Sequence, residues 1–129
     1  MDRVQKALEN HKKGYNCAQA VLCAFCDKTS FSEDELFKIS EAFGFGMGTQ
    51  GVCGAVSAMT FLAGISKSAG IASLPHSNKR QSYELSRDMI TAFENKNKSV
   101  ICQKIKGENL RSCDGCIEDA VEIIEKTLK

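Results

Sequence analysis

Apolar residues recur along nearly the whole chain at the spacing of one face of an α-helix. The segment 17–25 has them at i, i+3, i+4, i+7 and i+8, from Cys17 to Phe25, and 114–128 repeats the pattern from Ile117 to Leu128. Strand-like alternation of β-branched residues is almost absent, and Pro75 is the single proline. The pattern therefore predicts an all-α fold.

Capping signals mark where several helices begin. Asn16 is followed three residues later by Gln19, and Ser32 by Glu35, which is the capping-box spacing. Further helices are predicted over 2–13 and 79–95, the latter with Tyr83, Ser86, Ile90 and Phe93 on one side, and a short one around 102–105. The segment 52–65 is apolar on nearly every face, so we expect it to be a buried central helix. The sequence predicts one domain, 1–129, folded as a compact bundle of five to seven helices.

Charge and composition exclude some classes of function. Seventeen basic and sixteen acidic residues leave a formal net charge of +1, which gives no broad basic footprint for nucleic acid or an anionic membrane. The lysine-rich stretch 96–106 is interpreted as a solvated face. The charged N-terminus lacks the apolar core of a secretory signal, and 52–65 is too short to span a bilayer. We expect a cytoplasmic protein without membrane insertion and without a nucleic-acid partner.

Seven cysteines are unusual for a protein of that compartment, and their odd number argues against a full set of disulfides. Cys17, Cys53 and Cys116 each fall in the first turn of a predicted helix. Unpaired amides and the helix dipole stabilise a thiolate there and lower its pKa. Thiolates serve both as metal ligands and as nucleophiles, so the arrangement suits either role. Any one cysteine could instead be a small buried hydrophobe.

Two pairs have C-x-x-C spacing. Cys26 lies about 180° around its predicted helix from Cys17, so the pair with Cys23 is interpreted as incidental. Cys113 and Cys116 sit on a turn that enters a helix, where two sulfurs can converge on a metal, although a four-cysteine zinc site would need partners far away in the sequence. The segment 44–51 holds four glycines and is predicted to be a shaped loop, whose amides can face an anion.

Five of the cysteines occur in a fixed order: Cys17, then Cys53 in the run Cys53-Gly54-Ala55-Val56-Ser57-Ala58, then Cys102, then the pair at 113 and 116. This order resembles the C_GCAxxG_C_C family of redox-active proteins over nearly the whole chain. The run Tyr15–Val21 fits as well. In one departure, Ala58 stands where the family's motif ends in glycine, which adds a methyl group at a close approach. The resemblance implies that the family's cysteines are Cys17, Cys53, Cys102 and Cys116, with Cys113 as a substitute for Cys116.

A similar domain occurs in split-Soret cytochromes, which are dimers with an iron–sulfur centre beside haem. The resemblance therefore implies an iron–sulfur cluster bound by those four cysteines, with Gly51 and Gly54 at the binding site. It also implies a redox partner protein and leaves a homodimer open. No C-x-x-C-H haem attachment motif is present.

Three functions stay open. The first is binding an iron–sulfur cluster for electron transfer or assembly, and the second is thiol–disulfide exchange with Cys17 and Cys53 as the catalytic pair. The third is a structural or zinc-binding interaction domain, so the sequence leaves open whether the protein is an enzyme. We expect Cys17 and Cys53 to lie close together, because both open helices whose apolar faces must meet in one small core.

Overall fold

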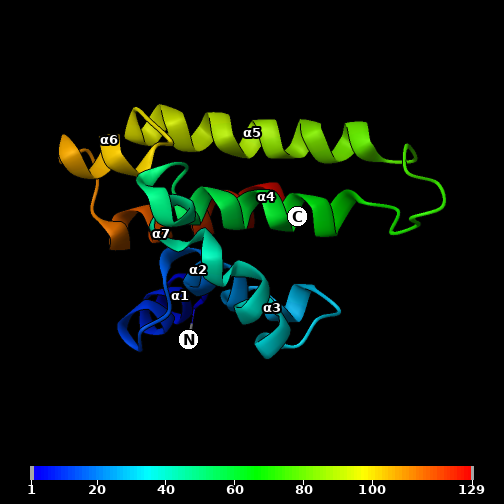
Figure 1. The fold of residues 1–129 in the computed structure, drawn as a ribbon, viewed down its shortest axis with the longest axis horizontal. Coiled ribbons are helices and arrows are strands. Elements are labelled where there is room, and N and C mark those ends of the chain that lie inside the picture. The colour runs from blue at the N-terminus through cyan, green and yellow to red at the C-terminus, as the bar shows by residue number, and fades with distance from the viewer. Residues whose placement is uncertain (1, 129) are drawn as a thin grey trace.

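The computed structural model describes residues 2–128, and the chain there is helical. The α-helices are α1 (Arg3–Lys12), α2 (Cys17–Ala24), α3 (Glu33–Ser40), α4 (Gly54–Lys67), α5 (Lys79–Asn97), α6 (Cys102–Gly107) and α7 (Cys113–Thr127) (Figure 1). Within this part of the chain there is no strand, and an isolated antiparallel bridge joins Val52 to Ile101. The prediction of an all-α bundle with five to seven helices is confirmed.

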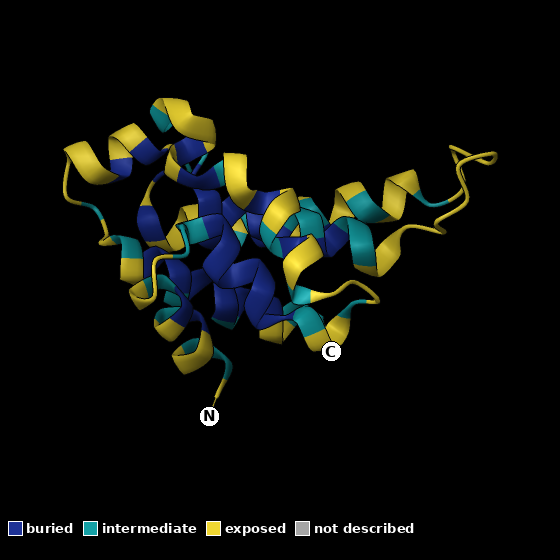
Figure 2. Cartoon of the chain, turned by 60° about the horizontal axis from the view of Figure 1, so that its bottom comes forward, coloured by how far each residue is buried: buried dark blue, intermediate teal, exposed yellow. Residues whose placement is uncertain are grey.

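Helix α4 is the centre of the bundle, and it contacts α2, α5 and α7. Its residues from Gly54 to Met59 are all buried, as the dark blue centre of Figure 2 shows. The prediction of a central buried helix is therefore confirmed. The helix begins two residues later than predicted, because Val52 pairs with Ile101 and Cys53 occupies the N-cap position.

Both predicted capping boxes are present. Gln19 donates its amide to the side chain of Asn16 at 2.9 Å and accepts from the Asn16 amide at 3.0 Å. Ser32 and Glu35 make the same reciprocal pair at the start of α3. Helix α2 is buried on every side from Ala18 to Ala24, because α1, α3, α4 and α7 all contact it. The single apolar stripe predicted for it is therefore too narrow.

The face that helix α5 turns inward agrees with the predicted one at Phe93 and Ile90 but not at Tyr83. Leu85, Met89 and Phe93 are buried at intervals of four residues, whereas Tyr83 is 57% exposed. The prediction for Tyr83 is wrong. Its aromatic ring fits an apolar periodicity in the sequence, but Leu85 and Met89 are the residues of α5 that are buried together with Phe93.

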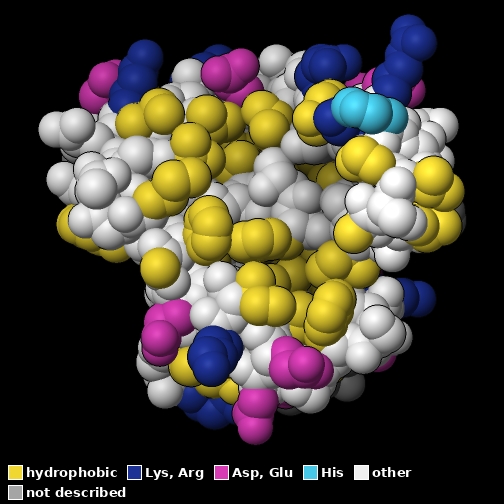
Figure 3. All heavy atoms as spheres, turned by 45° about the vertical axis from the view of Figure 1, so that its right-hand side comes forward, with side chains coloured by type: hydrophobic (Ala, Val, Ile, Leu, Met, Phe, Trp, Pro, Cys, Tyr) yellow, Lys and Arg dark blue, Asp and Glu magenta, His cyan; other side chains and the backbone are white. Residues whose placement is uncertain are grey.

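The connection between α4 and α5 projects from one end of the bundle (Figure 1). This connection exposes Ile71 and Leu74. The side of the molecule shown in Figure 3 carries a broad apolar area, with charged side chains above and below it. Within residues 2–128, each helix is too short or too polar to cross a membrane.

Candidate functional site

Cysteines from four helix starts line a single cavity of about 30 Å³. The first turns of α4, α6 and α7 gather at the left of Figure 1. Three of the cysteines are the first residues of α2, α6 and α7, one caps α4, and one lies three residues into α7. They are Cys17, Cys53, Cys102, Cys113 and Cys116. The structure thus brings together every cysteine that the resemblance implies, and both candidates of the 113/116 pair.

Gly54 allows the starts of α2 and α4 to meet. A Cβ atom on Gly54 would lie 3.0 Å from the amide nitrogen of Ala18 and 3.3 Å from Cβ of Cys17. No larger residue fits at this distance without separating the two helices. Cys17 and Cys53 consequently face the same cavity, which agrees with the prediction that they lie close together. Gly54 also lines the cavity.

Backbone hydrogen bonds place α6 against this pair. The amide of Cys53 donates to the carbonyl of Val100 at 2.7 Å, and the amide of Cys102 donates to the carbonyl of Gly51 at 2.6 Å. Gly51 itself lies outside the lining of the cavity. What it contributes in this structure is the carbonyl that holds the first residue of α6.

The glycine-rich segment forms a left-handed turn. Phe45, Gly46, Met47 and Gly48 all have φ between 54° and 73°. The amide of Gly51 donates to the carbonyl of Gly46 at 2.8 Å and closes the turn, so this amide does not face a sulfur. A Cβ atom on Gly46 would come 2.5 Å from the Gly51 nitrogen, which excludes any other residue there. Phe45 and Gly46 form one wall of the cavity.

Cys53 carries the most acidic thiol of the site. A hydrogen bond from Cys116 lowers the pKa of Cys53 to about 7, and the amides of Ala55 and Val56 add to this effect against the cost of burial. The same hydrogen bond, together with burial, raises the pKa of Cys116. The two side chains therefore share one proton near neutral pH, with the thiolate on Cys53 and the thiol on Cys116.

Cys17 and Cys102 are held as thiols. Burial and, to a smaller extent, the neighbouring sulfurs of Cys113 and Cys53 together raise the pKa of Cys17 to about 12. Burial also raises the pKa of Cys102. The prediction of a lowered pKa at each helix start is therefore wrong for Cys17 and Cys116. Burial of Cys17, and for Cys116 the hydrogen bond to Cys53 together with burial, outweigh the effect of a helix terminus.

Two cations that the sequence interpretation missed also line the cavity. Burial opposes the charged form of Lys106, but the neighbouring cysteine sulfurs, including a hydrogen bond with Cys113, outweigh burial and raise the pKa of Lys106. Lys106 is exposed, as the prediction of a solvated face requires, and it also lines the cavity. Its spacing of four residues from Cys102 was the available signal, since residues i and i+4 share a helix face.

The second cation, Arg111, is fixed by a buried carboxylate. Its guanidinium donates to both oxygens of Asp119, at 3.1 and 3.2 Å, and Asp119 is 3% exposed. Burial opposes the ionised form of Asp119, but hydrogen bonds from Arg111 and other donors outweigh it and lower the pKa. A Cβ atom on Gly115 would lie 2.4 Å from Nε of Arg111, so glycine between the two cysteines of α7 leaves room for this side chain.

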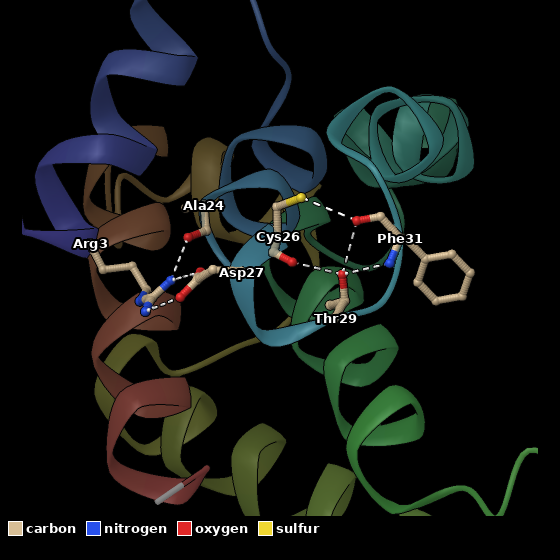
Figure 4. A network of polar contacts seen from close by, with 6 residues as sticks. All are labelled: Arg3, Ala24, Cys26, Asp27, Thr29 and Phe31. Carbon is tan, nitrogen blue, oxygen red and sulfur yellow. Dashed lines mark hydrogen bonds and ion pairs between the residues drawn. The ribbon is translucent and has the colours of Figure 1, made fainter.

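Cys23 and Cys26 lie outside the cavity. Cys23 is fully buried within α2, and its sulfur faces the carbonyl of Glu33 at 3.8 Å. Helix α2 ends at Ala24, so Cys26 lies in a 3₁₀ turn (Cys26–Lys28) and not on a helix flank as predicted. Its thiol donates to the carbonyl of Phe31 at 3.3 Å (Figure 4).

The donor set has the chemistry of a site for soft metals, because thiolates beside cations suit iron–sulfur clusters. No three His, Cys, Asp or Glu side chains among residues 2–128 are arranged around one metal position. The cavity of about 30 Å³ corresponds to one water molecule. A cluster of several atoms fits the donors in kind and number, but the sulfurs must move apart to admit it.

One comparison with known proteins gives a match. Residues 15–127 match the family described as "Putative redox-active protein (C_GCAxxG_C_C)". No curated protein and no solved structure matches the chain. The matched segment begins two residues before Cys17 and contains all the cysteines of the cavity.

Proposed function

Because the chain belongs to the C_GCAxxG_C_C family of redox-active proteins, we propose that its cysteine cavity binds an iron–sulfur cluster used in electron transfer or cluster assembly. The convergence of five cysteines from four helix starts supports this function. Disulfide exchange needs two sulfurs within bonding reach, whereas a cluster needs about four around one point.

Cys17, Cys53, Cys102 and Cys116 would hold the cluster, with Cys113 able to replace Cys116 from the same helical turn. When bound, the cluster supplies one-electron chemistry. The chain supplies a favourable field for an anionic group, because the amino ends of α2, α4 and α7 open here and Lys106 lies at the wall. Arg111 contributes less, since Asp119 already neutralises it.

A second function, thiol–disulfide exchange, is favoured by the shared proton of Cys53 and Cys116. The thiolate of Cys53 would attack a disulfide substrate, forming a mixed disulfide and releasing one substrate thiolate. Cys116, after losing its proton, would attack the sulfur of Cys53 and release the second substrate thiolate. The substrate disulfide is reduced, and a Cys53–Cys116 disulfide is formed. Here Cys116, and not Cys17, is the partner of Cys53.

Anaerobic purification with analysis of iron and acid-labile sulfide, together with a visible spectrum, tests the first function. We expect iron, sulfide and charge-transfer bands in the wild type, loss of all three in Cys53→Ser, and retention of all three in the control Cys26→Ser. A colourless protein without iron, also after anaerobic reconstitution with iron and sulfide, would refute cluster binding. In that case, mass spectrometry after reaction with oxidised glutathione distinguishes exchange, by a Cys53–Cys116 disulfide, from a protein without thiol chemistry.

A further inference from the structure

The left-handed turn beside the cavity directs apolar side chains into solvent. Phe45 is 53% exposed and Met47 is 49% exposed. Their φ values are 54° and 61°, a left-handed conformation that costs free energy for a residue with a side chain. Burial of these side chains does not offset that cost within the chain. Strained residues held by their surroundings cluster at functional surfaces.

A third exposed apolar residue adjoins the turn. Ile101 is 39% exposed and precedes α6, and it is held next to the turn by its bridge with Val52 and by the bond from Cys102 to Gly51. We call the surface formed by segments 44–51 and 98–106 the mouth surface. Its apolar centre consists of Phe45, Met47 and Ile101, and Phe45 is also a wall of the cysteine cavity.

The charged residues of the mouth surface are all basic. Segments 44–51 and 98–106 contain Lys98, Lys104 and Lys106 and no acidic residue, while Glu41 and Glu108 lie just outside them. The Nζ atom of Lys106 lies 5.3 Å from the centroid of the Phe45 ring, so one lysine is directly on the apolar centre. Lys104 follows Ile101 by three residues and therefore shares its side of α6.

We propose that the mouth surface is the docking site of a small acidic electron-carrier protein that exchanges electrons with the cysteine cavity. This inference rests on the proposed redox function. A small apolar centre with charges of one sign around it is the design of transient redox interfaces, where charge guides association and apolar contacts fix the orientation. A partner that contacts Phe45 and Lys106 lies against the redox site itself, since both residues line the cavity.

Calorimetric titration of the anaerobically purified protein with oxidised flavodoxin, an acidic carrier used as the probe, tests the docking. We expect binding at low ionic strength that weakens at least fivefold between about 20 and 200 mM salt, because exposed charges are screened over this range. A carbodiimide joins lysines directly to carboxylates in the complex. Mass spectrometry should then place the cross-links on Lys98, Lys104 and Lys106, and not on Lys67 or Lys79.

Two variants remove one feature each. Met47→Asn replaces an apolar side chain by a polar one, and asparagine tolerates the left-handed conformation. Lys104→Glu reverses a charge. We expect each to weaken binding about fivefold or more. The matched controls are Leu74→Asn and Lys79→Glu, which lie at or next to the α4–α5 connection, at the opposite end of the bundle from α6 (Figure 1). They should leave the dissociation constant unchanged.

The inference is overturned if neither flavodoxin nor a plant-type ferredoxin binds at low salt, if basic cytochrome c binds as well as they do, or if the controls weaken binding as much as the variants. Its failure is distinct from failure of the proposed function. Iron and sulfide in the protein without binding of an acidic carrier would refute only the docking site. Binding and cross-links at the mouth surface in a protein without iron would refute the cluster and leave the docking site in place.

Discussion

Gly54→Ala tests whether the close approach of α2 and α4 builds the cysteine site. The new methyl group would lie 3.0 Å from the Ala18 nitrogen, 3.1 Å from the Phe43 oxygen and 3.3 Å from Cβ of Cys17. The first two are backbone atoms, which cannot rotate away as the end of a flexible side chain can. The helices must therefore separate by a few tenths of an ångström, and overpacking of this kind costs about 1–3 kcal/mol.

The higher helix propensity of alanine opposes this cost and must be subtracted from it. Alanine is favoured over glycine by up to about 1 kcal/mol inside a helix, and by less at the first position of α4, where Gly54 stands. The expected net loss in the free energy of unfolding is about 1–2 kcal/mol. For a chain of this size, that corresponds to a decrease of roughly 3–8 °C in the melting temperature. Urea denaturation followed by circular dichroism measures the free energy directly.

Gly64→Ala is the matched control, because it makes the same chemical change in the same helix. A Cβ atom on Gly64 has no neighbour within 4 Å, so this variant should be as stable as the wild type or up to about 1 kcal/mol more stable. Gly54→Ala should also bind less iron than Gly64→Ala when both are purified anaerobically. If Gly54→Ala is as stable as Gly64→Ala and loads as much iron, the argument from the close approach is refuted.

Three further predictions follow from the site and its surroundings. Thiolate absorbance near 240 nm in the metal-free reduced protein should show a titration with a midpoint near pH 7, and Cys116→Ala should move that midpoint upward, because it removes the donor that stabilises the Cys53 thiolate; an unchanged midpoint contradicts the assignment. Cys26→Ser should change the free energy of unfolding by less than about 1 kcal/mol in urea titrations, since serine can keep the hydrogen bond to Phe31. Cys23→Ser should lower the free energy of unfolding by about 1–3 kcal/mol, because Cys23 is fully buried. Asp119→Asn should lower the free energy of unfolding by about 1.5–3 kcal/mol, because it breaks a charge-assisted pair at a buried carboxylate. Its control, Glu122→Gln, lies on the exposed side of the same ion cluster and should lower the free energy of unfolding by less than about 0.5 kcal/mol.

The helices could be predicted from the sequence because their signals are local. The capping boxes at Asn16 and Ser32 and the apolar character of 52–65 need only neighbouring residues, and the structure confirms each of them. The face of α5 could not be read in the same way. It depends on which residues meet α4, and Tyr83 competes with Leu85 in any periodic pattern.

The sequence predicts which cysteines form the site, but not the direction in which the pKa of each thiol is shifted. A helix start favours a thiolate, and this rule identified Cys17, Cys53 and Cys116 as candidates for one site. The sign of each pKa shift depends on burial and on the hydrogen bonds between sulfurs, which are properties of the tertiary structure. Cys113 and Cys116 could not be separated for a related reason. They stand at the first and fourth positions of α7, nearly one turn apart, so both reach the cavity.

The charge of the cavity depends chiefly on one residue. Arg111 is neutralised by the buried carboxylate of Asp119, whereas Lys106 contacts Cys113 at the cavity and lies over the ring of Phe45. A positive charge at this place favours the thiolate of Cys53, and it equally favours a cluster held by several thiolates. The same lysine is part of the mouth surface. A carboxylate of a docked carrier that pairs with Lys106 would reduce its contact with Cys113, so association at the surface and the charge of the redox site are coupled through this side chain.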